Sequence, residues 1–296
     1  MTLVREYDAA TAPRGVFRHV LSIAGYPGIV WQNRYMVQNF LRRDLLSRAH
    51  GSLLGIWWLL LHPLFMFCIY FLVFGMFLGN QKAGQPPDPT FAIYLFSGVI
   101  VFHALTEATT QCCQIVVDNG NLVKKVAFPS EALVVHVGLV SLVLYCVGAA
   151  VCVPVGWMLG VLHPGWLLCA LPLVLVVQFS LTIGIGLLLA NLYVFLRDVS
   201  QLWRVATSVW MFLTPVFWTP RLFAEKQFPS WFTSIITHGN AAAPLLQAHR
   251  LALGMAPETP VTFWAQLGLA AAWAAGFLLV GYTTFMASKH KYADLV

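Results

Sequence analysis

Long, nearly uncharged apolar runs recur along almost the whole chain, and they constrain its fold more than any other feature. A helix that crosses a bilayer needs about 20 mainly apolar residues. The composition agrees, because 59% of the 296 residues are hydrophobic and only 9% are charged, whereas about a quarter of a typical soluble domain is charged. We therefore expect a polytopic membrane protein.

Six of these runs are long enough to predict transmembrane helices. A lipid-exposed backbone must satisfy its own hydrogen bonds, and the runs are too long and too uniform for barrel strands. The fold class is therefore all-α, with an N-terminal cytoplasmic segment over residues 1–52 and one membrane domain over residues 53–296. The expected spans are residues 53–79, 91–117, 132–161, 166–195, 200–218 and 262–287.

Lysines and arginines set the expected orientation. With six spans both termini lie on one side, and that side would carry thirteen of the seventeen basic residues. Loops rich in Lys and Arg stay in the cytoplasm. We therefore expect cytoplasmic termini and a location in the inner membrane of a bacterium.

Residues 27–52 show an amphipathic helical pattern, with apolar residues on one face and Arg34, Arg42 and Arg43 on another. Such a helix suits the cytoplasmic headgroup layer, although an ordinary basic face on a helix packed against protein is the alternative. We expect an interface helix. Together with Arg48, the three arginines are our candidates for contact with an anionic headgroup.

Residues 219–261 contain two apolar pieces, 228–237 and 241–253, that are each too short to span a bilayer. A helix pair that enters from the outer side and turns back satisfies the rule that protein must bury such breaks. Two helices lying flat on the surface are the alternative. We expect the re-entrant pair.

No motif for nucleotide, metal or hydrolytic chemistry occurs in the sequence. There is no G-x-x-x-x-G-K-[S/T] phosphate loop, no H-E-x-x-H and no G-x-S-x-G. We therefore expect that the chain is not an enzyme, that it holds no metal and no cofactor of its own, and that any ATP hydrolysis comes from another polypeptide.

Glu107 is the only acid well inside an expected span, and His103 precedes it by four residues on the same helical face. A charge at the bilayer centre costs about 2.5–3.5 kcal/mol. The pair has two interpretations: a proton relay or substrate contact, or a polar group that hydrogen-bonds within the bundle. A proton-coupled carrier would be expected to have more acids in its spans.

Aromatic residues crowd the first and fifth expected spans. Flat aromatic faces can receive sugar C–H surfaces while their N–H and O–H groups bind hydroxyls, although lipid contact and core packing are the more ordinary roles. The candidates for lining a substrate path are Trp57, Trp58, Phe65, Tyr70, Phe74, Trp203, Trp210 and Phe217.

The entry to the first span reads R-D-L-L-S-R-A-H-G-S-L-L-G-I-W-W over residues 43–58, and H-P follows at residues 62–63. Later segments read Y-V-F-L-R-D-V over residues 193–199 and T-P-V over residues 214–216, and residues 240–254 contain N-A-A-A-P, A-H-R and a final glycine. In this order the segments resemble the membrane subunits of type-2 ABC exporters for polysaccharides, the O-antigen and capsule branch.

Four positions depart from the family pattern. His62 precedes the proline where the family usually has asparagine, and His249 precedes Arg250 where the family usually has tyrosine. Ala49 stands where tyrosine is common, and Asn240 is separated from Pro244 where the family usually has N-P together.

The resemblance implies an export function and a set of partners. It implies a homodimer of six-span subunits bound to two ATPase subunits that hold ATP and Mg²⁺. A lipid-linked polysaccharide would pass along the dimer interface, lined by the first and fifth spans. Membrane lipids and periplasmic envelope export proteins are further expected partners, and nucleic acid is not. A drug or lipid permease of the same architecture and a proton-coupled secondary transporter are the alternatives.

The resemblance also implies a cytoplasmic coupling helix in the loop between the second and third spans, residues 118–131. Leu122 and Val126 would form a small apolar face for a groove on the ATPase. The alternative is a basic loop that only sets the topology. The residues expected to contact the ATPase are Asn121, Leu122, Lys124, Lys125, Phe128 and Pro129.

Overall fold

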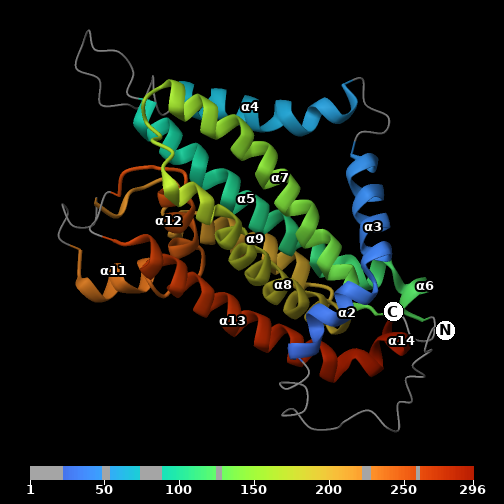
Figure 1. Ribbon diagram of the computed structural model, residues 1–296. Coiled ribbons are helices and arrows are strands. Elements are labelled where there is room, and N and C mark those ends of the chain that lie inside the picture. The colour runs from blue at the N-terminus through green and yellow to red at the C-terminus, as the bar shows by residue number, and fades with distance from the viewer. Residues whose placement is uncertain (1–22, 49–53, 74–88, 125–128, 222–227, 258–260) are drawn as a thin grey trace.

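The computed structural model describes residues 23–48, 54–73, 89–124, 129–221, 228–257 and 261–296, and over these residues the chain is helical with no strand (Figure 1). Long helices lie side by side and are joined by turns and short helices. The all-α prediction is confirmed.

Four helical segments are long and apolar enough to cross a bilayer. They match the second, third, fourth and sixth expected spans, which are therefore confirmed as long apolar helices. The segments are α5 (Pro89–Asp118), α7 (Glu131–Met158), η4 (Trp166–Ala170) with α8 (Leu171–Phe195), and α13 (Phe263–Ser288) with η5 (Lys289–Lys291). We call these four segments the frame.

The core of the frame lies along α5, which is buried on most of its circumference between α7 and α8. The closest helix pair is α8 with α13. A Cβ at Gly281 would collide with the backbone oxygen of Gly184, and a Cβ at Gly184 would collide with the backbone of Leu278. Small residues let helices approach in this way within a membrane, so these two glycines set the spacing of the pair.

The helices at the first and fifth expected spans are shorter. The first is α4 (Trp58–Tyr70), preceded by η2 (Gly55–Trp57), and the fifth is α9 (Val199–Leu213). At 1.5 Å per residue, α4 and α9 cover about 20 Å and 22 Å, against a hydrocarbon core of about 30 Å. Residues 53 and 74–79 of the first expected span lie outside the described residues. The six-span topology thus stays a prediction.

The end of α9 has a local cause. Thr214 leaves the helical conformation with φ −97° and ψ 145°, and Pro215 follows it. The residue before a proline is pushed toward extended backbone, so the helix stops five residues before the expected end at residue 218. The sequence interpretation ran the span through this Thr-Pro pair and overestimated its helical length.

The N-terminal pattern forms two helices rather than one. They are α2 (Tyr26–Gln32), after η1 (Ile23–Gly25), and α3 (Arg34–Ser47). The break falls at Asn33, whose side-chain Nδ2 donates to the backbone oxygen of Ile29 at 2.8 Å. Asn competes with helical backbone through such local bonds, which explains why one continuous helix over residues 27–52 was wrong.

The two ends of the frame carry different short helices (Figure 1). At one end are α11 (Ser230–Thr237) and α12 (Ala242–Ala252), and at the other are α2, α6 (Gly120–Val123) and α14 (Tyr292–Leu295). The α12 helix is buried almost throughout against α5, α8 and α13, whereas half of the residues of α11 are exposed. The expected pair is therefore one inserted helix and one surface helix.

Candidate functional site

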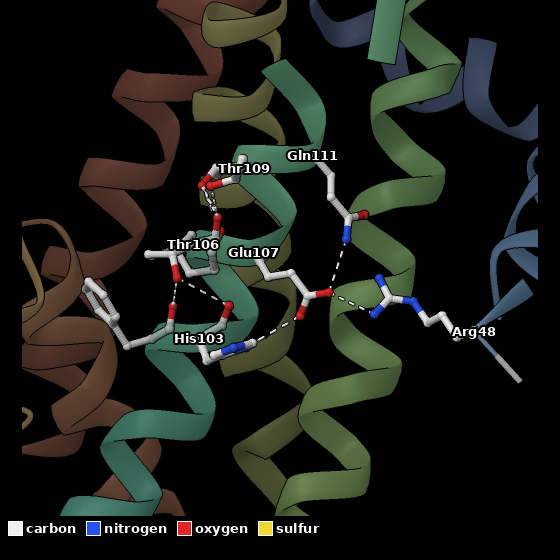
Figure 2. A network of polar contacts seen from close by, with 9 residues as sticks. Arg48, His103, Thr106, Glu107, Thr109 and Gln111 are labelled. Atoms are coloured by element: carbon white, nitrogen blue, oxygen red, sulfur yellow. Dashed lines mark hydrogen bonds and ion pairs between the residues drawn. The ribbon is translucent and has the colours of Figure 1, made fainter. Parts of the chain in front are cut away.

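A polar network on α5 joins residues that the sequence had singled out separately (Figure 2). Glu107 Oε1 accepts hydrogen bonds from Arg48 Nη1 at 2.8 Å and from Gln111 Nε2 at 3.1 Å, and Glu107 Oε2 lies 3.4 Å from His103 Nδ1. The i, i+4 spacing explains why His103, Glu107 and Gln111 share a face. Arg48 is 59 residues distant in sequence, so periodicity could not have paired it with Glu107.

A cavity of about 520 Å³ lies beside this network. Its walls come from α4, α5 and α7, with Arg48 and Glu107 among the residues that line it. Two histidines, His62 of α4 and His103 of α5, lie on the same polar side. The remaining lining residues are apolar or glycine: Gly55, Trp58, Pro63, Met66, Phe96, Val99, Ile100, Ala104, Leu144 and Gly148.

The predicted aromatic lining divides between exposed and packed side chains. On the α4 side, Trp57 is 65% exposed and Phe65 is 55% exposed, whereas Trp58 lines the cavity. Tyr70 is the last residue of α4, and Phe74 lies outside the described residues. Trp58 is itself 43% exposed, so three of the five α4-side candidates are exposed.

On α9 the predicted tryptophans pack inward. Trp203 Nε1 donates to Thr109 Oγ1 at 3.1 Å, and Trp210 Nε1 donates to Asn240 Oδ1 at 2.7 Å. The two indole rings meet edge to face with their centroids 6.0 Å apart. These side chains attach α9 to α5 and to the start of α12, and a role in lining a path stays a prediction.

A different set of α9 residues faces outward. Leu202, Val205, Val209 and Phe212 are all exposed and recur every three or four residues, which places them in one stripe. Phe217, beyond the end of the helix, stacks on Phe212 with ring centroids 5.4 Å apart. The sequence interpretation counted aromatics and missed this mainly aliphatic stripe, which its helical period would have revealed.

The C-terminal end of α9 is held by three polar side chains. Arg250 of α12 donates from Nη1 to the oxygen of Pro215 at 2.8 Å, and its guanidinium lies 3.4 Å from the ring centroid of Tyr94. Tyr94 Oη donates to the same Pro215 oxygen at 3.2 Å. Asn240 Nδ2 donates to Thr214 Oγ1 at 2.9 Å. The backbone that leaves α9 is therefore fixed to α5 and α12.

The four predicted headgroup cations separate into two groups. Arg34, Arg42 and Arg43 are exposed, and the Arg34 guanidinium lies over the exposed rings of Trp31 and Tyr35 at 5.3 Å and 4.7 Å. Arg42 and Arg43 border a second hollow, of about 440 Å³, on α3. Arg48 instead pairs with Glu107. Whether any of them contacts a headgroup stays a prediction.

The expected coupling loop contains the short helix α6. Asn121 and Lys124 are exposed, Leu122 is half-buried, and Pro129 is half-buried just before α7. The helix rests on the C-terminal end of the chain, since a Cβ at Gly120 would lie 2.5 Å from Val296 Cγ1. Outside the described residues lie Lys125, Val126 and Phe128.

The C-terminal segment is itself fixed to the frame. Lys289 Nζ pairs with Glu131 Oε2 at 2.6 Å. Tyr292 is fully buried, and its hydroxyl donates to Asn191 Oδ1 at 3.0 Å. Burial raises the pKa of Tyr292 above its ordinary value, so the hydroxyl remains a donor. One end of the frame therefore presents α6 on a rigid support.

The long apolar frame defines a multi-pass membrane protein in which an ion pair and a cavity lie beside the central helix. A family model described as ABC-2 type transporter matches residues 35–243, which is more than half of the chain. The chain belongs to the ABC-2 type transporter family.

Two relatives are similar over much of their length. The chain is 25% identical over 187 residues to the O-antigen export system permease protein RfbA of Myxococcus xanthus, covering 63% of this chain and 69% of that protein. It is 21% identical over 256 residues to a protein of the same name from Klebsiella pneumoniae, covering 86% of this chain and 92% of that protein.

Proposed function

We propose that the chain is the membrane permease subunit of an ATP-driven exporter of lipid-linked cell-surface polysaccharide, either O-antigen or capsule. The observation that carries the proposal is the family match over residues 35–243 together with two relatives named as O-antigen export permeases. The sequence has no phosphate loop, so on this proposal a separate ATPase binds ATP and Mg²⁺ and this chain forms the path.

The proposal includes a topology. Both α4 and α9 would complete six spans, with both termini in the cytoplasm and α11 and α12 at the outer face of a bacterial inner membrane. Residues 1–52 would form the cytoplasmic segment and residues 53–296 the membrane domain. The basic residues near the termini support this orientation.

The N-terminal helices α2 and α3 would lie at the cytoplasmic headgroups. Trp31, Arg34 and Tyr35 support this placement, because their exposed rings and guanidinium form one cluster. Aromatic rings and cations favour the boundary between hydrocarbon and water. Arg42 and Arg43 would extend the same basic surface toward a phosphate-bearing lipid.

The short helix α6 would dock on the ATPase. Its exposed Asn121 and Lys124 are available to a partner, and the contact between Gly120 and Val296 prevents the helix from retreating into the frame. Leu122, Lys125, Phe128 and Pro129 would complete the docking surface. A push on α6 would then reach α5 and α7 directly, because α6 lies between them in the chain.

The exposed faces of α4 and α9 would meet the same faces of a second copy. Four exposed apolar residues on α9 and the exposed Trp57 and Phe65 on the α4 side support this, since a bare apolar surface of this kind needs either lipid or protein to cover it. The polysaccharide would slide along this seam by many weak contacts. Periplasmic envelope proteins would receive it at the α11–α12 end.

A deletion experiment tests the proposed export function. Removing the gene should abolish the surface polysaccharide while lipid-linked polymer accumulates inside, and the wild-type gene should restore it. Cells with normal surface polysaccharide would contradict the proposal. Drug hypersensitivity with unchanged polysaccharide would contradict it in favour of a drug permease.

A second experiment tests the proposed docking role of α6. Lys124→Glu should weaken co-purification with the ATPase encoded nearby, because it reverses an exposed charge without disturbing the frame. Lys291→Glu, an exposed charge on η5 outside the loop, is the control and should leave co-purification intact. Equal loss for both variants would remove the specific role of α6.

A further inference from the structure

The cavity beside Glu107 has a polar side and an apolar side. Along α5 its lining runs from Phe96 through Ile100 to His103 and Glu107. Eleven residues of helix rise about 16 Å, and over this distance the wall changes from apolar to charged. A ligand that fits must therefore combine a polar head with an apolar body.

The polar side offers hydrogen-bond donors. Both oxygens of Glu107 are already engaged, one by Arg48 and Gln111 and the other by His103. Arg48 uses only Nη1 in this pair, and a guanidinium has five N–H donors. Among the described residues, nothing else accepts from its Nη2 or Nε.

These donors face a reachable volume. The Arg48 side chain is 29% exposed, and it lines the cavity together with the ring of His62. Glu107 lines the same side, but both of its oxygens are already engaged, so the donors left for a ligand belong to Arg48. A head that fits must accept hydrogen bonds, and phosphate oxygens suit a guanidinium best.

The apolar side is suited to a hydrocarbon chain. Met66 of α4, Phe96 and Ile100 of α5 and Leu144 of α7 form its wall. The volume of about 520 Å³ lies in the range of small-ligand sites. It accommodates a phosphate head with part of one chain.

We propose that this cavity binds one anionic phospholipid of the surrounding bilayer, with its phosphate at Arg48 and His62 and part of one acyl chain against α5 and α7. The cavity lies between α4 and the frame, whereas Trp57 and Phe65 on the α4 side are exposed. The lipid therefore fills a space behind α4 and stays with the protein. It adds to the contacts that hold α4 against α5 and α7.

Native mass spectrometry of the full-length chain in detergent tests this, with phosphatidylglycerol and phosphatidylcholine supplied in equal amounts. Wild type should retain phosphatidylglycerol in preference to phosphatidylcholine. Arg48→Gln should reduce retention at least about tenfold, the effect of losing a charge-assisted contact. Arg197→Gln, at an exposed arginine between α8 and α9 that does not line the cavity, is the control and should retain the lipid.

Two further variants address the apolar and polar sides separately. Leu144→Trp fills the cavity without changing charge and should also reduce retention. His62→Leu removes a polar side chain from the exposed polar side. Because it adds no bulk to the cavity, it still tests the proposal if Leu144→Trp prevents folding. Equal retention of the zwitterionic lipid, or equal loss in Arg197→Gln, would overturn the proposal.

A competition experiment separates the bilayer lipid from the anchor of an exported polymer. Polyprenyl phosphate added to the lipid-loaded chain should leave the phosphatidylglycerol adduct in place. Displacement would overturn the assignment to a bilayer lipid. Because retention is measured without transport, its outcome is independent of the proposed export function.

Discussion

The frame and the two short helices α4 and α9 differ in how closely they pack against the rest of the chain. Within the frame, α8 and α13 touch through Gly184 and Gly281 so closely that neither position has room for a side chain. In contrast, Phe212 on α9 is 68% exposed. The frame helices pack closely where they meet one another, although α13 also exposes apolar side chains such as Trp264 and Leu279. On α4 and α9, which are shorter, the exposed apolar side chains likewise need lipid or protein outside the chain to cover them. The fixed helices are thus suited to transmit movement, and the displayed helices to meet partners.

The largest expected effect comes from the α8–α13 contact. Gly281→Leu should prevent recovery of folded protein, because its side chain would enter the backbone of α8. Fluorescence-detected size-exclusion chromatography of a fusion measures this. Gly276→Leu is a matched control on the same helix, where no atom lies within 4 Å of the added Cβ. A normal folded peak for Gly281→Leu would remove the distinction between a tight frame and a loose pair.

A smaller effect is expected at the C-terminal end of α9. Arg250→Ala should lower the free energy of unfolding by about 3 kcal/mol, since it removes one charged donor from each of the oxygens of Pro215 and Tyr94 and leaves a cavity where the buried guanidinium lay. Thermal unfolding in detergent measures the change. Arg204→Ala, exposed on α9, should stay within about 0.5 kcal/mol. Equal effects would mean that Arg250 does not anchor α9.

The end of the frame that carries α6 and α14 should show an intermediate effect. Lys289→Ala leaves the carboxylate of Glu131 buried without its cation and should cost about 2 kcal/mol. Adding Glu131→Gln should recover part of this loss, because it removes the stranded charge. Thermal unfolding of the single and double variants in detergent measures how much stability is recovered. A double variant less stable than Lys289→Ala would argue against the ion pair as the cause.

The smallest effect on stability is expected on the exposed stripe. Phe212→Ala should change the free energy of unfolding by less than about 0.5 kcal/mol, while surface polysaccharide falls because the proposed seam loses contact area. Trp210→Ala, on the inward face of the same helix, should destabilise the protein instead. If Phe212→Ala were the more destabilising of the two, the stripe would belong to the core.

The sequence predicted the frame well because lipid imposes a strong rule on composition. Four long runs had to be helices, and the structure has helices there. It predicted the ends less well, because Asn33 and Thr214 interrupt helices through local bonds and a following proline rather than through a change in hydropathy. These signals were readable in the sequence, but we gave them less weight than the apolar runs.

Only the part of the site that comes from residues close together in the sequence could be predicted. The spacing of His103 and Glu107 indicated a shared face, and the structure pairs them. The partner Arg48 and the anchor formed by Tyr94, Asn240 and Arg250 depend on contacts between distant segments, which no periodicity encodes. The cavity lies between α4, α5 and α7, so it could not be predicted without knowing how these three helices pack.

The central claim is that this chain forms a path and depends on a separate ATPase to drive transport. Proteoliposomes that contain the purified chain, its ATPase or both, together with lipid-linked polysaccharide, test it most directly. The account predicts ATP-dependent appearance of polymer on the far side only when both proteins are present. Transport by the chain alone, or ATP hydrolysis by the chain alone, would contradict it.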